Sequence, residues 1–106
     1  MRVLFVCTGN IDRSRTAQEM FNGIHGIEAK SAGTSYDAPV QLSKKLIQWA
    51  DKIFCMESKH EKIVLKFDPE SREKIEVLNI PDIYTRGEPE LKRLLEKKVQ
   101  TLIQVE

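Results

Sequence analysis

Short apolar runs alternate with helical patterns along most of this chain. The run from Val3 to Val6 is apolar at every position, which is typical of a strand buried on both faces. Residues 27–31 instead alternate apolar and polar side chains, as a half-exposed strand does. Apolar runs at 53–56 and 75–80 indicate two further strands. The hydrophobic pattern therefore predicts four short strands.

Helical patterns lie between and after these strands. Apolar residues recur three or four positions apart from 17 to 24, in a helix that begins near Ser14, and again from 42 to 50 and from 91 to 103. Residues 58–67 can form another helix. Pro89, flanked by two glutamates, opens the last one. A short loop is expected at 32–35.

Strands that alternate with helices predict an α/β fold with a doubly wound, four-stranded parallel sheet and helices on both faces. We expect the wholly apolar first strand near the centre and the alternating second strand at an edge, which gives the order 2-1-3-4. Ligands bind such sheets at the carboxyl ends of strands, where the order reverses. Cys7 ends the first strand and would lie there. The whole chain, 1–106, is expected to form a single domain.

Cys7 and Arg13 enclose a five-residue loop between the first strand and the first helix. Backbone N–H groups of such a turn point inward and the helix N-terminus adds partial positive charge, so the loop can hold an anion. Gly9 and Asn10 tolerate left-handed backbone. The spacing alone is a weak signal. Its position between strand and helix favours capture of a phosphate ester by a cysteine thiolate.

Composition narrows the function classes. The formal net charge is +1, from 17 basic and 16 acidic side chains, so no global field selects nucleic acid or a membrane. Two cysteines without a short-spaced pair argue against a disulfide framework and a zinc site. The sequence also shows neither a signal-peptide core nor a bilayer-spanning stretch. We expect a cytoplasmic protein without metal or cofactor.

A cysteine, five residues, an arginine and a serine directly after an N-terminal strand resemble the signature of the low-molecular-weight protein tyrosine phosphatases. Segments 31–34, 53–57 and 81–84 are similar to further family segments, in the family order. The resemblance covers most of the chain. It implies a single phosphatase-like domain that hydrolyses phosphotyrosine in a protein, or a small aryl phosphate, through a phosphocysteine intermediate.

The resemblance also implies roles for individual residues. Cys7 would be the nucleophile, Arg13 would grip the phosphoryl oxygens, and Asp82 would be the acid that protonates the leaving oxygen. Asp68 competes with Asp82 for that role. We favour Asp82 because it follows the last strand, at the ligand-binding edge. The expected substrate-binding residues are Thr8, Gly9, Asn10, Ile11, Asp12, Ser14 and Tyr84.

Several departures from the family pattern carry information. Asp12 replaces a cysteine that is frequent in the loop, so it should point away from the phosphate or weaken dianion binding. Ile11 is apolar where relatives selective for phosphoarginine tend to carry threonine, which favours an aromatic substrate. The family's loop-bracing histidine has no identifiable counterpart. His25 and His60 are expected to be solvated.

Two alternative functions stay open. An arsenate reductase of the same fold needs further thiols, and the chain offers only Cys55, which we interpret as a buried apolar residue, so an external thiol would be required. A phosphate-binding module that has lost catalysis is compatible with the missing brace. The retained Cys7, Arg13 and Asp82 disfavour it.

Overall fold

The computed structural model describes residues 1–103, and its sheet confirms the predicted fold class and topology. Four parallel strands pair in the order β2-β1-β3-β4. They are β1 (Arg2–Cys7), β2 (Glu28–Gly33), β3 (Lys52–Cys55) and β4 (Ile75–Val77). The last three positions of the predicted domain, 104–106, lie outside the described residues.

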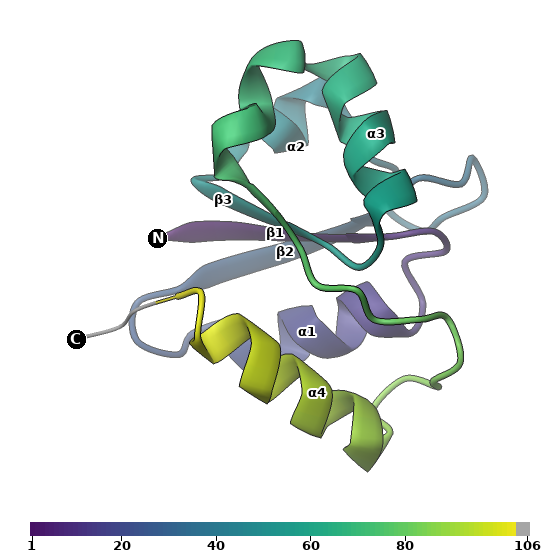
Figure 1. The fold of residues 1–106 in the computed structure, drawn as a ribbon, viewed down its shortest axis with the longest axis vertical. Helices are drawn as coiled ribbons and strands as arrows, with labels where there is room; N and C mark the ends of the chain where they lie inside the picture. The colour runs from purple at the N-terminus through teal and green to yellow at the C-terminus, as the bar shows by residue number, and fades with distance from the viewer. Residues whose placement is uncertain (104–106) are drawn as a thin grey trace.

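Helices cover both faces of this sheet (Figure 1). Helices α1 (Arg13–Phe21) and α4 (Pro89–Gln100) lie on one face, and α2 (Lys44–Trp49) and α3 (Ser58–Phe67) lie on the other. A short 3-10 helix, η1 (Pro69–Lys74), follows α3 and was not predicted. No helix within residues 1–103 has the length and apolar character needed to cross a membrane.

Strand β1 separates two apolar cores, which explains its unbroken hydrophobic run. Phe5 faces α1 and α4 and stacks on Phe21 and Phe54, with ring centroids 5.9 Å and 5.5 Å apart. Leu4 and Val6 face α2 and α3. Because successive side chains point to opposite faces, both faces of a central strand must be apolar. This burial places the carboxyl end of β1, and Cys7 with it, at the point where the strand order reverses.

Two predicted strand ends differ from the structure. Strand β2 continues through Gly33, part of the segment expected to be a loop, because the backbone there packs directly on the loop after β1: a Cβ on Gly33 would lie 2.6 Å from the carbonyl oxygen of Thr8. Strand β4 stops at Val77, although Leu78 and Ile80 are buried. The backbone N–H groups of Leu78 and Ile80 still donate to the carbonyl oxygens of Cys55 and Met56, both at 2.8 Å, so the chain stays bonded to the β3 segment beyond the assigned end of β4.

Candidate active site

The loop after β1 is folded around the sulfur of Cys7. The carbonyl oxygens of Cys7 and Thr8 accept hydrogen bonds from the backbone N–H groups of residues 34 and 35, which lie outside the loop. Asn10 adopts the left-handed conformation, with φ of 56°, and its N–H points at Cys7 Sγ from 3.2 Å. Carbonyls directed outward and an N–H directed at the sulfur give the loop the polarity of an anion cradle.

A cavity of about 90 Å³ opens over this loop. The side chains and backbone that line it are those of Cys7, Gly9, Ile11, Asp12, Arg13 and Asp82. The structure thus brings together the three residues predicted to carry out catalysis. They come from the end of β1, the start of α1 and the loop after β4, which meet at one edge of the sheet.

Ser14 and Asn10 form a buried network beneath the sulfur. The oxygen of the Ser14 hydroxyl lies 3.0 Å from Cys7 Sγ and accepts a hydrogen bond of 2.9 Å from Asn10 Nδ2. Asn10 Nδ2 also donates to Ser31 Oγ at 2.9 Å. A Cys7 thiol donates to the Ser14 oxygen, and a Cys7 thiolate can instead accept the rotatable proton of the Ser14 hydroxyl. Ser14 lies inside α1 and is not its N-cap, which is Asp12.

Arg13 is held in one orientation by two acceptors. Its side chain is 1% exposed, and Nη1 donates to Glu57 Oε1 and to the carbonyl oxygen of Ile80, both at 2.7 Å. The hydrogen bond from Arg13 in turn holds the pKa of Glu57 below its usual range. Because both N–H groups of Nη1 are engaged, the Nε and Nη2 N–H groups remain for an oxyanion.

Asp82 stands above the guanidinium. Its side chain is 63% exposed, and Oδ1 lies 3.7 Å from Arg13 Nε. The competing candidate, Asp68, caps η1 by accepting a hydrogen bond from the N–H of Glu70. Asp68 therefore precedes β4, whereas Asp82 follows it at the edge of the sheet that carries the cavity. This placement supports the preference for Asp82.

The expectation that His60 is solvated is wrong. The ring is fully buried, because α3 begins with a capping box in which His60 packs back toward Glu57. His60 Nδ1 accepts from the N–H of Glu57 at 3.0 Å, so Nε2 carries the proton and donates to Thr8 Oγ1 at 2.9 Å. Burial and the nearby Arg13 lower the pKa of His60 to about 4. A neutral histidine on α3 thus holds the loop after β1 in place through its hydrogen bond to Thr8.

Glu57 and His60 are the site residues that sequence reasoning missed. Two signals could have found them. Glu57 stands directly beyond β3, the strand next to β1, and is therefore at the ligand-binding edge. His60 follows it by three positions, which is the spacing of a capping box.

The other predicted binding residues differ in their placement. Ile11 is 58% exposed at the cavity rim. Thr8 binds His60 and is not among the residues that line the cavity. Tyr84 is half-buried and packs against the core beside α1 and α4, so the structure does not bring it to the cavity as the sequence led us to expect. Its ring is used for packing.

Cys55 is buried, as predicted. Burial raises the pKa of its thiol to about 12. Its side chain belongs to the core beside α2 and α3, whereas Cys7 belongs to the core on the opposite face of the sheet. The two thiols therefore have the sheet between them, and a direct disulfide between them would require the sheet to open.

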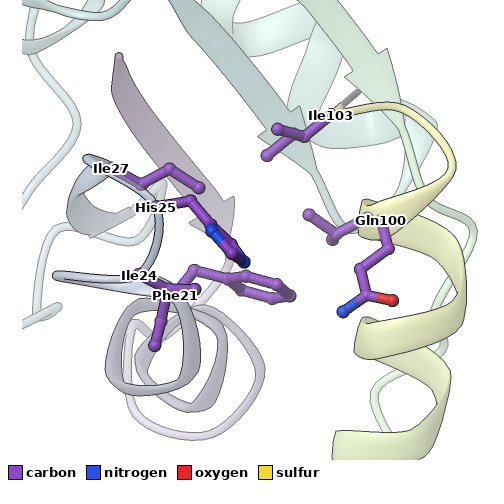
Figure 2. Close-up of a pocket in the computed structure, with 7 residues that line it drawn as sticks. Phe21, Ile24, His25, Ile27, Gln100 and Ile103 are labelled. Carbon is purple, nitrogen blue, oxygen red and sulfur yellow. The ribbon is translucent and has the colours of Figure 1, made fainter. Parts of the chain in front are cut away.

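A second cavity lies at the other end of the molecule, between the turn after α1 and the end of α4 (Figure 2). Its lining is mostly apolar and consists of Phe21, Ile24, His25, Ile27, Val99, Gln100 and Ile103. It is small, about 40 Å³, and contains none of the predicted site residues.

The buried His60 predicts acid sensitivity. Between pH 6.5 and about 4 an unfolded histidine binds a proton that the folded one does not, so the free energy of unfolding should fall as the pH decreases. The shift corresponds to about 3 kcal/mol. Urea titrations of wild type and His60→Gln across this range measure it, with the exposed His25→Gln as control. If wild type and His60→Gln lose stability in parallel, the buried neutral imidazole is contradicted.

Comparisons with known proteins agree with this architecture. A model of the low molecular weight phosphotyrosine protein phosphatases matches residues 2–41, which hold β1, the loop, α1 and β2. A protein-arginine-phosphatase from Geobacillus stearothermophilus is 32% identical over 97 residues, covering 69% of this chain and 66% of that protein, slightly less than two thirds of its length.

Two solved structures show the same fold over nearly the full chain. The arginine phosphatase from Geobacillus stearothermophilus is 28% identical, with a TM-score of 0.68 and coverage of 95% of this chain and 94% of that one. A low molecular weight protein tyrosine phosphatase from T. tengcongensis is 26% identical, with a TM-score of 0.72 and coverage of 95% and 99%. These comparisons support the family predicted from the sequence: residues 2–41 match the model of the low molecular weight phosphotyrosine protein phosphatases, and the fold is similar over nearly the full chain.

Proposed function

We propose that this protein is a cysteine-dependent phosphomonoesterase that works through a phosphocysteine intermediate. The observation that carries the proposal is the single cavity lined by Cys7, Arg13 and Asp82. A nucleophile, a cation and a carboxylate around one anion-sized space are the groups that phosphoryl transfer needs.

In the first step, the Cys7 thiolate attacks phosphorus. An S–P bond forms while the P–O bond to the leaving group breaks, and protonated Asp82 gives its proton to the departing oxygen. Arg13 Nε and Nη2, together with the loop N–H groups, bind the nonbridging oxygens as charge is redistributed. Because Glu57 and Ile80 fix the guanidinium beforehand, little reorganisation is needed at that moment.

In the second step, water attacks the phosphocysteine. The Asp82 carboxylate takes a proton from this water, an O–P bond forms, and the S–P bond breaks to release phosphate and the thiolate. The Ser14 hydroxyl, 3.0 Å from the sulfur, stabilises the thiolate as the leaving group. Asp82 thereby returns to its protonated form for the next turnover.

The substrate that we propose is phosphotyrosine in a protein, or a small aryl phosphate. Ile11 gives the cavity rim an apolar side chain suited to an aromatic ring. A second candidate is phosphoarginine, because one relative is named a protein-arginine-phosphatase. Both substrates would place the same phosphoryl group over Cys7.

The remaining alternatives are less well supported. Arsenate reduction by a disulfide relay would need a thiol near Cys7, and Cys55 lies on the opposite face of the sheet. The sequence was compatible with loss of catalysis because it showed no histidine that would brace the loop, but His60 binds Thr8 of that loop. We also propose a cytoplasmic location, in which both free cysteines would stay reduced.

Asp82→Asn tests the proposal together with a panel of substrates. Wild type should hydrolyse phenyl phosphate, p-nitrophenyl phosphate and a phosphotyrosine peptide faster than a phosphoarginine peptide. Asp82→Asn should lower kcat by about 100-fold for phenyl phosphate, because its leaving group depends on protonation. The reduction should be smaller for p-nitrophenyl phosphate, whose anion leaves readily.

Asp68→Asn is the matched control and should retain wild-type kcat for both esters. If Asp82→Asn lowers kcat by the same factor for both esters, Asp82 is not the acid that protonates the leaving group. Faster hydrolysis of the phosphoarginine peptide than of the phosphotyrosine peptide would identify phosphoarginine as the preferred substrate. No hydrolysis of any member of the panel by wild type would overturn the phosphatase proposal.

A further inference from the structure

We propose that Asp12 is a positioning residue that fastens the acid-bearing loop, residues 81–88, to the phosphate loop. The inference rests on the proposed function, since it concerns the placement of Asp82. It gives a structural role to the Asp12 carboxylate, whose negative charge would otherwise only repel a bound phosphate.

The central observation is a hydrogen bond between segments 74 residues apart. Asp12 Oδ1 accepts from the backbone N–H of Arg86 at 2.9 Å. Asp12 occupies the N-cap position of α1, where an aspartate usually accepts from the helix's own N–H groups, yet it makes no such bond. Its carboxylate is directed to the other loop instead.

A neighbouring contact strengthens the attachment. Thr16, one turn further along α1, accepts from the N–H of Gly87 at 2.9 Å and donates to the carbonyl oxygen of Asp12 at 2.7 Å. Two consecutive backbone N–H groups of the acid-bearing loop are thus bound by the first turns of α1. The Arg86 guanidinium also pairs with Glu19, but both side chains are exposed, so this ion pair contributes little.

The attachment closes the loop around Asp82. At the start of the loop, the N–H of Ile80 donates to the carbonyl oxygen of Met56 at 2.8 Å, and the Ile80 carbonyl oxygen accepts from Arg13. At its end, Arg86 is bound to Asp12. Asp82 lies between these two anchors and is itself exposed. Anchoring both ends restricts where its carboxyl group can stand above the cavity.

The contact also bears on the charge of the site. The sequence predicted that Asp12 should point away from the phosphate or weaken its binding. In the structure, Asp12 lines the cavity, and its carboxylate accepts an N–H from the loop opposite. A hydrogen bond to a charged acceptor offsets part of the charge that a bound phosphate would meet.

Arg86 offers a clean way to remove the donor. Residues 85–88 form a turn in which the N–H of Glu88 donates to the carbonyl oxygen of Thr85 at 3.1 Å, and Gly87 has φ of 78°. These are the features of a type II turn with Arg86 at its second position, where proline is favoured. Arg86→Pro therefore deletes the N–H without opposing the turn. Arg86→Ala keeps the N–H and removes only the pair with Glu19.

The experiment compares kcat for phenyl phosphate and p-nitrophenyl phosphate. Arg86→Pro and Asp12→Ala should each lower kcat for phenyl phosphate by about 10-fold, with a smaller loss for p-nitrophenyl phosphate, because misplacing the acid affects the poorer leaving group. The double variant should be no slower than either single one. Arg86→Ala should match wild type. Asp12→Asn keeps an acceptor oxygen and should keep the wild-type ratio of the two kcat values.

Amide hydrogen exchange gives a readout that does not depend on activity. The Arg86 N–H should exchange faster in Asp12→Ala than in wild type and stay protected in Asp12→Asn. Multiplicative losses in the double variant, or Arg86→Pro behaving as Arg86→Ala, would overturn the positioning role. Unchanged Arg86 exchange in Asp12→Ala would overturn the attachment itself. A wild type without hydrolysis would contradict the proposed function alone, because the exchange result would still stand.

Discussion

Cys7→Ser is expected to lower kcat for p-nitrophenyl phosphate by about 10,000-fold or more, while inorganic phosphate still binds. A serine hydroxyl holds its proton much more strongly than a thiol, so far less of the anionic nucleophile is present at neutral pH. The two groups hydrogen-bonded to Sγ, the Asn10 N–H and the Ser14 hydroxyl, are not basic enough to activate a serine hydroxyl. Loss of the nucleophile commonly removes most of an enzyme's rate enhancement.

Two measurements separate this result from unfolding. Calorimetric titration with phosphate should give a Kd within a few-fold of wild type, because Arg13 and the loop N–H groups remain. Acid quench during turnover should trap phosphorus on the wild-type protein but not on Cys7→Ala, in which residue 7 offers no acceptor atom. Turnover by Cys7→Ser at a rate near that of wild type would contradict the nucleophile assignment.

Cys55→Ser is the matched control. Its side chain faces the other core and should not alter kcat, although burying a hydroxyl there should lower the free energy of unfolding by about 1–3 kcal/mol. Thermal melts of both serine variants therefore measure the cost of the substitution itself.

The fold was predictable because the strands differ in how they are buried. An unbroken apolar run at 3–6 requires two covered faces, and this places β1 between its neighbours. Cys7 and Asp82 each follow a strand of the parallel sheet. Because the carboxyl ends of parallel strands lie at the same edge, both residues are expected at the edge where ligands bind. The end of the last strand was less predictable, because Leu78 and Ile80 are buried and still bonded to the β3 segment although the regular strand ends at Val77.

The brace could not be predicted from side-chain type. His60 is surrounded in sequence by lysines and a glutamate, which is the pattern of a solvated face. Its burial follows from the geometry at the start of α3, where the capping box turns the ring toward Glu57 and Thr8. Tyr84 shows the converse: its position two residues after Asp82 suggested a substrate contact, and the core of α1 and α4 holds it instead.

Arg13→Lys is expected to lower kcat/KM by about 1,000-fold, although the charge is kept. The guanidinium binds Glu57 and Ile80 through one nitrogen and leaves two further nitrogens for phosphoryl oxygens. An ammonium has one nitrogen with three donors and cannot serve both sets from a single place. Because removing one preorganised donor costs about 100- to 1,000-fold, losing the paired geometry should reach the upper end of that range.

Glu57→Gln separates orientation from contact with the substrate. Glutamine can still accept from Arg13 Nη1, but the charge-assisted part of the 2.7 Å hydrogen bond is lost. We expect kcat/KM to fall by about 10-fold, much less than for Arg13→Lys, and Arg13→Lys/Glu57→Gln to be no slower than Arg13→Lys. Steady-state kinetics with p-nitrophenyl phosphate measure all three variants. If the two losses multiply, Glu57 acts by a route other than the orientation of Arg13.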